Sequence, residues 1–325
     1  MQSFILLLPD GTPFTASMAD VEYFRLFCSR LAINYGSQIG ASVAVFFVLL
    51  ILTKREKMLS WIFIINALCL VINIIRSLLQ ALYTVGHWAN MYAVLSVVFG
   101  RVTATDKGIT IAAGTLTLFL AICIFISLSM QVWIVCVTAG VRQRVIIMGA
   151  TTTVALVAVG YRFTITAISN MQTMKYEGMA EYDHLVTSSN IAQAVAIWMY
   201  CAVFTSKLGY ALLQRRRLGM TQFGPMQIIF VMGCQTMVIP GTSILPTISH
   251  ANRLHTAIFF VLQFESSIPE LGSQALTVTC IFLPLSAIWA GVSNTDSGFS
   301  DGDSSSHRHM VKGYFGRTPV GSPEK

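Results

Sequence analysis

The stretch QRRRLGMTQFGPMQIIFVMGCQTMVIPGTSILP, residues 214–246, places a cluster of arginines shortly before a long apolar run. Arginine side chains enter hydrocarbon only at a large free-energy cost, so the cluster predicts a loop at a membrane surface. The run from Ile228 to Ile244 is long enough to cross most of a bilayer core. Pro240 removes a backbone donor and predicts a bend, which is either a static kink or a hinge. Gln235, about one and a half turns earlier, needs a hydrogen bond from a neighbouring helix.

The composition of the whole chain predicts an integral membrane protein. Of its 325 residues, 54% are hydrophobic and 11% are charged, whereas soluble domains have about a quarter of their residues charged. The formal net charge is +7, but the basic residues fall at the ends of apolar spans and form no single stripe. This pattern disfavours nucleic acid as a partner and favours lipid headgroups and a partner on the inner side of the membrane.

Seven apolar spans predict an all-α membrane protein, a seven-transmembrane helix bundle over residues 35–292. The first five spans are residues 35–53, 61–83, 109–137, 145–168 and 185–213, followed by a sixth that ends near 248 and a seventh that ends near 292. Residues 1–34 are expected to form an extracellular segment of modest order, and residues 293–325 a disordered cytoplasmic tail.

The charges of the connections predict the orientation. Those after spans 1, 3 and 5 hold Lys and Arg almost without acids, whereas those after spans 2, 4 and 6 carry mixed charge. By the positive-inside rule, the N-terminus lies outside and the C-terminus inside. We expect a multi-pass membrane protein.

The residue types inside the spans argue against an enzyme. All six histidines lie in predicted loops or in the tail, so no cluster of His, Asp and Glu is available at membrane depth to hold a catalytic metal. The seventh span has no lysine, which excludes a retinal Schiff base of the microbial rhodopsin type. We therefore expect no metal, no cofactor and no catalytic residue.

Three cations nevertheless lie within the predicted spans. Lys207 is close enough to the arginine cluster to extend its ammonium group to the inner surface, and Arg162 is expected to reach the outer headgroups. Arg76 is in the middle of span 2, with Asn66 and Asn73 on neighbouring turns. It either faces an internal polar region or is purely structural.

Uncharged polar residues predict hydrogen bonds between the spans. The candidates are Asn66, Ser127, Gln131, Gln235, Thr236 and Ser286. Each such bond contributes about 0.6 to 2 kcal/mol, so an exchange of a few bonds shifts an equilibrium between two conformations. Gly36 and Gly40 have the GxxxG spacing that allows two helices to approach closely, either within one chain or between two copies.

Several segments together resemble one family. They are RRRLGMTQF and CQTMVIP around span 6, IFIIN (residues 62–66), the GxxxGA of span 1, and LPLSAIWA (residues 283–290). In combination they are similar to the fungal alpha-factor type of mating pheromone receptor, the class D G-protein-coupled receptors. The resemblance extends from about residue 36 to residue 292. Arg76 departs from the family pattern, because one example of the family carries a histidine at the matching position in span 2.

The resemblance implies a multi-pass receptor of the plasma membrane for a secreted, unlipidated peptide pheromone, which activates a heterotrimeric G protein and mating MAP-kinase signalling. The resemblance assigns activation-switch roles to Asn66, Ser127, Gln131, Gln235, Pro240 and Ser286. We add Thr236, because it is among the uncharged polar residues that are predicted to form hydrogen bonds between spans. The resemblance matches the G-protein contact to Arg215, Arg216, Leu218, Gly219 and Gln222, and we include Arg142 and Arg217 as further cations of the inner connections. It ties Gly36 and Gly40 to a homodimer.

We expect the peptide to enter between the spans from outside. The predicted ligand-binding residues are Arg76, Tyr83, Trp88, Arg101, Asp183 and Arg253. Peptide contacts would weaken the restraint at Gln235 and Pro240 and open a cleft for the G protein on the inner side. The alternative is a seven-helix transporter or channel, in which Arg76 and the polar residues line a permeation path.

Overall fold

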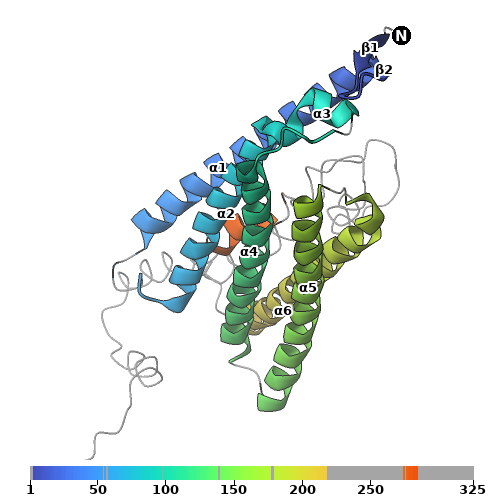
Figure 1. Ribbon diagram of the computed structural model, residues 1–325. Helices are drawn as coiled ribbons and strands as arrows, with labels where there is room; N and C mark the ends of the chain where they lie inside the picture. Colours follow the sequence, from blue (N-terminus) through green and yellow to red (C-terminus); the bar gives the residue numbers. More distant parts are fainter. Residues whose placement is uncertain are drawn as a thin grey trace, which may run out of the picture.

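The structure, a computed structural model, describes residues 3–53, 55, 58–96, 98–137, 140–176, 179–217, 274 and 276–284. These residues are mostly helical (Figure 1). Five helices are long and apolar enough to cross a membrane: α1 (Met18–Leu52), α2 (Trp61–Val85), α4 (Ala104–Cys136), α5 (Val141–Lys175) and α6 (Asp183–Arg217). Residues 276–284 form a further helical stretch, within the predicted seventh span. The sixth span lies outside the described residues.

The first five predicted spans each fall on one of the long helices, but most of the helices are longer than predicted. Helix α5, for example, extends several residues past the predicted span, residues 145–168, at both ends. A helix of 35 residues measures about 50 Å, whereas a bilayer core measures about 30 Å. The hydrophobic pattern indicates the part of each helix that lies in hydrocarbon, and the polar turns beyond it continue the helix.

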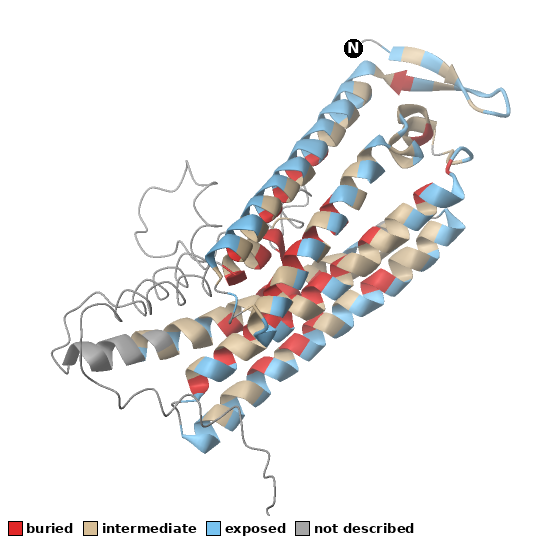
Figure 2. Ribbon diagram, turned by 90° about the vertical axis from the view of Figure 1, so that its left-hand side faces the viewer, coloured by how far each residue is buried: buried red, intermediate tan, exposed pale blue. Residues whose placement is uncertain are grey.

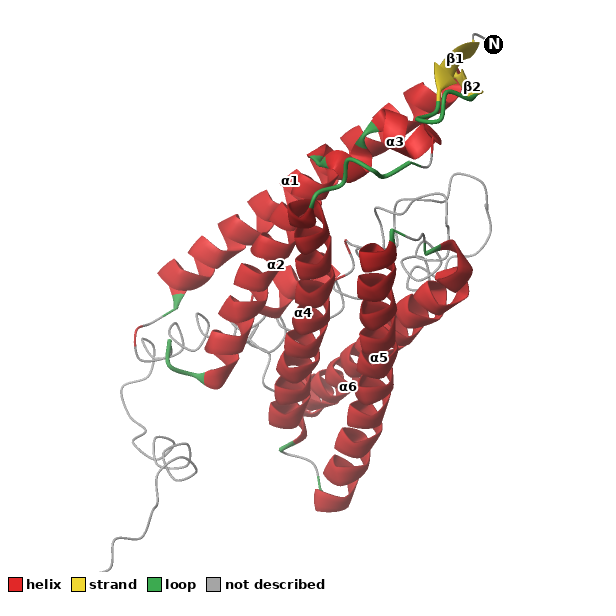
Figure 3. Cartoon of the chain, viewed as in Figure 1, coloured by secondary structure: helices red, strands yellow, loops and turns green. Residues whose placement is uncertain are grey.

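The N-terminal segment differs most from its prediction. Residues 3–17 form a hairpin of β1 (Ser3–Leu7) and β2 (Pro13–Ser17), and α1 begins at Met18 instead of Tyr35 (Figure 3). The expectation of modest order over residues 1–34 was therefore wrong for the described part. The turn is stabilised locally, because the Asp10 side chain accepts hydrogen bonds from the Thr12 hydroxyl and backbone N–H, which also lower the pKa of Asp10. Ser17 then caps the helix by accepting from the Ala19 N–H.

The predicted long loop after span 2 is folded into short helices. It contains η2 (His87–Ala89) and α3 (Met91–Ser96), and η3 (Ala180–Tyr182) lies between α5 and α6. The Tyr92 hydroxyl donates to the Leu7 carbonyl over 2.7 Å, which joins α3 to the hairpin. We call this side of the molecule the hairpin end, and the side with the connections after α1 and α4 the opposite end.

Helix α4 is the central element of the bundle and contacts α2, α5 and α6. Its residues Leu120, Ala121 and Ile124 are fully buried and belong to the main hydrophobic core. Buried residues follow the lines along which helices face one another, while the outer faces are exposed (Figure 2). Many exposed residues are large and apolar, such as Phe119 and Ile126 on α4. Such an exterior suits lipid as the surrounding solvent.

Candidate functional site

Arg76 is the centre of a buried polar cluster. Its side chain is only 2% exposed. The Nε group donates to Thr117 Oγ1 over 3.0 Å, and Nη1 donates to Asn73 Oδ1 over 3.2 Å. Both acceptors are neutral, so these contacts satisfy hydrogen bonds of the guanidinium group without neutralising its charge. Arg76 thus faces an internal polar region, and its role in ligand binding stays a prediction.

The cluster continues from Arg76 into α1 and into the helical stretch near residue 280. Asn73 donates to Ser42 Oγ over 2.9 Å and accepts from Thr277 over 3.2 Å. Gln38 Oε1 accepts from Thr277 over 2.8 Å and from Ser77 over 3.3 Å.

We call the full set the Arg76 network: Asn34, Gln38 and Ser42 of α1, Asn73, Arg76 and Ser77 of α2, Thr117 of α4, and Gln274 and Thr277. Buried polar groups are stable when they are hydrogen-bonded to one another, and each bond between membrane helices contributes about 0.6 kcal/mol. The network therefore fixes the relative positions of α1, α2, α4 and the residue 274–284 stretch.

Arg162, on α5, is partly exposed. Its Nε atom is buried and has no hydrogen-bond partner among the described residues. That Arg162 reaches the outer headgroups stays a prediction.

A second group of polar contacts lies about two turns or more closer to the opposite end. The Ser127 hydroxyl of α4 donates to Asn66 Oδ1 of α2 over 2.6 Å, so two of the residues predicted to form hydrogen bonds between spans bond to each other. Two buried amide donors, Asn66 Nδ2 and Gln131 Nε2, have no partner among the described residues.

Ser129 of α4 connects this level to α6. Its hydroxyl and that of Tyr200 lie 2.7 Å apart. Tyr200 is 1% exposed, and its ring packs 6.3 Å from that of Phe125. We call Asn66, Ser127, Ser129, Gln131 and Tyr200 the second polar level. Residues two positions apart on a helix point in widely different directions. Ser127 and Ser129 therefore join α4 to different neighbours, α2 and α6.

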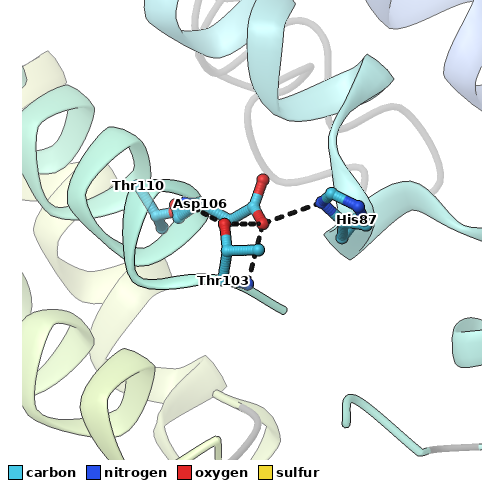
Figure 4. Close-up of polar contacts among 4 residues, drawn as sticks. All are labelled: His87, Thr103, Asp106 and Thr110. Atoms are coloured by element: carbon cyan, nitrogen blue, oxygen red, sulfur yellow. Dashed lines mark hydrogen bonds and ion pairs between the residues drawn. The ribbon is translucent and has the colours of Figure 1, made fainter. Parts of the chain in front are cut away.

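At the hairpin end, one carboxylate joins η2, which directly follows α2, to the start of α4 (Figure 4). Asp106 accepts from the Thr103 backbone and hydroxyl, and the Thr103 hydroxyl in turn accepts from the Asp106 backbone N–H, which forms a capping box. The same carboxylate lies 2.9 Å from His87 Nδ1. Gly86 makes room for this contact, because an added Cβ would lie 3.2 Å from Asp106 Oδ1.

Most of the predicted ligand-binding residues lie toward the same end. Trp88 packs against Phe99, with ring centroids 5.5 Å apart, and against Tyr176 at 6.3 Å. Lys107 lies over the Tyr176 ring and donates to the Met174 carbonyl over 3.0 Å. The others are exposed in α2, before α4 and at the start of α6: Tyr83, Arg101 and Asp183. Topology brings them to one end of the bundle, while Arg76 lies deeper.

The predicted G-protein contacts are only partly described. Arg142 is exposed in the first turn of α5, where Arg144 lies over the ring of Trp133. Arg215, Arg216 and Arg217 are the last residues of α6. Eight other predicted residues lie outside the described residues: Leu218, Gly219, Gln222, Gln235, Thr236, Pro240, Arg253 and Ser286.

Gly36 and Gly40 are exposed on α1. An added Cβ at either position meets nothing within 4 Å. Among the described residues, the GxxxG spacing therefore does not serve close packing within the chain.

Several members of these clusters escaped prediction. Asn34, Gln38 and Ser42 share one face of α1 at intervals of four residues, a spacing that could have revealed them. Thr117 and Tyr200 carry no such signal, because a single threonine or tyrosine in an apolar helix is common and its partner is distant in sequence.

Comparison with known proteins gives a consistent result. A family model described as the fungal pheromone mating factor STE2 GPCR matches residues 1–291. The pheromone alpha factor receptor of Saccharomyces cerevisiae is 24% identical over 271 residues, which cover 82% of this chain and 58% of the yeast protein. That of Lachancea kluyveri is 24% identical, with 91% and 66% covered. The P-factor receptor of Schizosaccharomyces pombe is 25% identical, with 78% and 70% covered.

The chain thus spans about three fifths to two thirds of the length of the two alpha factor receptors that it matches.

Proposed function

Because the chain belongs to the family of fungal STE2 pheromone mating factor receptors, we propose that it is a plasma-membrane receptor for a secreted, unlipidated peptide pheromone. In this proposal it has seven spans, an outer N-terminus and an inner C-terminus, and it activates a heterotrimeric G protein that drives mating MAP-kinase signalling. The observation that carries the proposal is the family match over nearly the whole membrane domain. The named relatives are receptors for alpha factor and P-factor.

The arrangement of the polar residues supports a path for the signal. Exposed polar and aromatic residues gather at the hairpin end, where a peptide would arrive. The Arg76 network lies deeper and joins four parts of the bundle, and the second polar level follows toward the opposite end. A ligand that favours one set of interhelical hydrogen bonds over another shifts the population of the two conformations.

The inner end would transmit the shift to the G protein. Helix α6 ends in three arginines, and Arg142 is exposed in the first turn of α5. Cationic side chains there suit an acidic or polar protein surface near anionic lipid. In this proposal, release of the predicted restraint at Gln235 and Pro240 lets this end open.

The receptor is further proposed to form a homodimer through α1. Gly36 and Gly40 lie on an exposed face with open space above them, so a second helix could approach the backbone closely there. Leucine at Gly40 would then weaken cross-linking between two copies and leave the fold intact, since no neighbour in the described part of the chain contacts this position.

Nucleotide exchange tests the proposed function directly. The receptor is reconstituted in lipid nanodiscs with a purified fungal heterotrimer, and a library of short synthetic peptides is applied. Peptide-dependent exchange of GDP for GTP supports the receptor. Uptake of solutes or ion current in proteoliposomes without any G protein, and no exchange with any peptide, would favour the transporter or channel instead.

A further inference from the structure

Helices α4 and α5 carry an exposed pair of side chains where the two helices meet at the opposite end. Trp133, in the last turn of α4, is 49% exposed, and the guanidinium group of Arg144, in the first turn of α5, lies 3.4 Å from the centroid of its ring. Both helix ends lie at the lower edge of the bundle in Figure 1. A cation–π contact holds the guanidinium group in place but does not neutralise its charge. We call these two residues the Trp133–Arg144 pair.

The sequence around the pair is positively charged. Residues 137–144 read VTAGVRQR, which adds Arg142 to Arg144 and contains no acid. The six acids of the described residues all lie near the hairpin end: Asp10, Asp20, Glu22, Asp106, Glu181 and Asp183. This surface therefore attracts a negatively charged partner.

Large apolar side chains next to the pair in sequence are exposed as well. They are Ile134 and Val137 on α4, and Val145 and Ile146 on α5. Apolar groups of this size are stable at a surface when hydrocarbon covers them. The partner that fits both features carries a negative charge and a hydrocarbon part, whereas a soluble anion would match the arginines alone.

The pair also lies at the depth that is expected for lipid phosphates. The predicted spans end at residue 137 and begin at residue 145, so Arg144 is at the polar boundary and Trp133 is about one turn inside it. Tryptophan is enriched at this boundary of a membrane. Arginine binds phosphate through the paired N–H donors of its planar guanidinium group. A phosphate bound there would place its acyl chains along the apolar residues of both helices.

We propose that the Trp133–Arg144 pair binds the phosphate group of an anionic phospholipid in the leaflet at the opposite end. Arg144 donates hydrogen bonds to the phosphate, Arg142 adds positive charge, and the acyl chains pack against Trp133, Ile134 and Val145. A zwitterionic headgroup is disfavoured, because it has no net charge for the two arginines to attract. The proposal needs only a protein that crosses a membrane. Under the proposed function this leaflet is the inner one, and the bound lipid joins α4 to α5 beside the G-protein contact.

Fluorescence quenching tests which lipid lies beside Trp133. The receptor is reconstituted in vesicles of equal amounts of phosphatidylcholine and phosphatidylserine, and the acyl chains of one of the two lipids carry bromine atoms, which quench tryptophan on contact. The chain has five tryptophans, so the signal of Trp133 is the difference between wild type and Trp133→Phe. The same mixture without bromine is the reference. Phosphatidylserine should be enriched beside Trp133 about 5-fold, the factor expected for one arginine near a membrane surface.

Substitution of Arg144 identifies the residue responsible. Arg144→Gln should remove most of the enrichment, and Arg144→Lys, which keeps the charge, should retain more of it. Arg55→Gln is the matched control, because it removes an exposed cation from the connection after α1, at the same end of the molecule. This control lowers the charge of the protein by the same amount and should leave the enrichment unchanged.

A second arm separates a lipid from a soluble anion. Glycerophosphoserine, which is the headgroup without its acyl chains, and inorganic phosphate are added at millimolar concentration, with KCl of equal ionic strength as the control. Neither should displace the brominated phosphatidylserine more than KCl does, because neither covers the apolar side chains. Displacement by inorganic phosphate beyond the effect of KCl would assign the site to a soluble anion and overturn the proposal.

Three further results would overturn the inference. The first is equal quenching of Trp133 by the two brominated lipids in wild type. The second is no quenching by either lipid, because another part of the chain or a second copy would then cover the surface. The third is an equal loss of enrichment in Arg144→Gln and Arg55→Gln, which would assign the effect to the overall charge of the protein. A receptor that enriches phosphatidylserine but shows no peptide-driven nucleotide exchange contradicts the proposed function alone.

Discussion

The two polar levels inside the bundle are built differently. The Arg76 network carries positive charge and joins α1, α2, α4 and residues 274–284 through many mutual hydrogen bonds. The second polar level is neutral, and it leaves Asn66 Nδ2 and Gln131 Nε2 without partners in the described part of the chain. A spare donor allows hydrogen bonds to be exchanged at little cost, whereas a buried cation depends on every acceptor that it has. The Arg76 network therefore suits a rigid part of the bundle, which we call the frame, and the second polar level suits a movable contact.

The largest effect is expected when the frame loses a central acceptor. Asn73→Leu removes the acceptor shared by Arg76 and Thr277 and the donor to Ser42. A hydrogen bond to a charged group contributes about 1.5 to 3 kcal/mol, and each neutral bond between helices about 0.6. The variant should lose about 3 kcal/mol of unfolding free energy, measured by chemical unfolding in detergent micelles.

Ser77→Ala is the matched control for this variant, since it removes a weaker member of the same network on the same helix. Its bond to Gln38 is 3.3 Å long, and Gln38 retains the bond from Thr277. The loss should be about 0.5 kcal/mol. Equal losses for the two variants would contradict the view that the frame depends on Arg76.

A smaller effect is expected at the contact between α4 and α6. Tyr200→Phe removes the hydroxyl next to Ser129 and keeps the ring that packs against Phe125. The cost should be about 1 kcal/mol. If this contact restrains the resting conformation, peptide-independent nucleotide exchange should also rise. Ser129→Ala should have the same effect, and the double variant should add little to either change.

The contact between Asn66 and Ser127 should show a still smaller coupling. A double-mutant cycle of Asn66→Ala and Ser127→Ala isolates the 2.6 Å bond from the other effects of each change. In a membrane bundle the coupling should be about 0.6 kcal/mol and no more than about 1.7. A coupling as large as the loss in Asn73→Leu would mean that the second polar level is as rigid as the frame.

The sequence predicted the helices better than the contacts between them. Hydrophobic spans and basic connections reveal where helices cross the membrane, because each is a property of neighbouring residues. The start of α1 was missed because the helix continues through polar residues beyond the apolar run, as at Arg25 and Arg30. The order of residues 86–103 was missed because α3 is held by Tyr92 bonding to Leu7, 85 residues away.

The candidate site was predicted only where a polar residue is conspicuous in its own span. Three polar residues stand out in the apolar sequence of α2: Asn66, Asn73 and Arg76. All three are buried inside the bundle. Their partners Thr117 and Ser42 are small and frequent in membrane helices, so pairing depends on helix packing that the sequence does not reveal. Arg162 was noticed as well, but the hydrophobic pattern of α5 does not tell which face of that helix meets α4.

The smallest effect on stability is expected at Gln131, which the family resemblance links to activation. Its Nε2 atom is buried and donates no hydrogen bond to any residue that the structure describes. Gln131→Leu should therefore change the unfolding free energy by less than about 1 kcal/mol, and in the stabilising direction, because an unpaired buried donor is removed. Peptide-driven nucleotide exchange should nevertheless decrease if the amide finds its partner only in the active conformation. Unchanged exchange together with unchanged stability would remove Gln131 from the switch, and a large loss of stability would show that the second polar level is part of the frame.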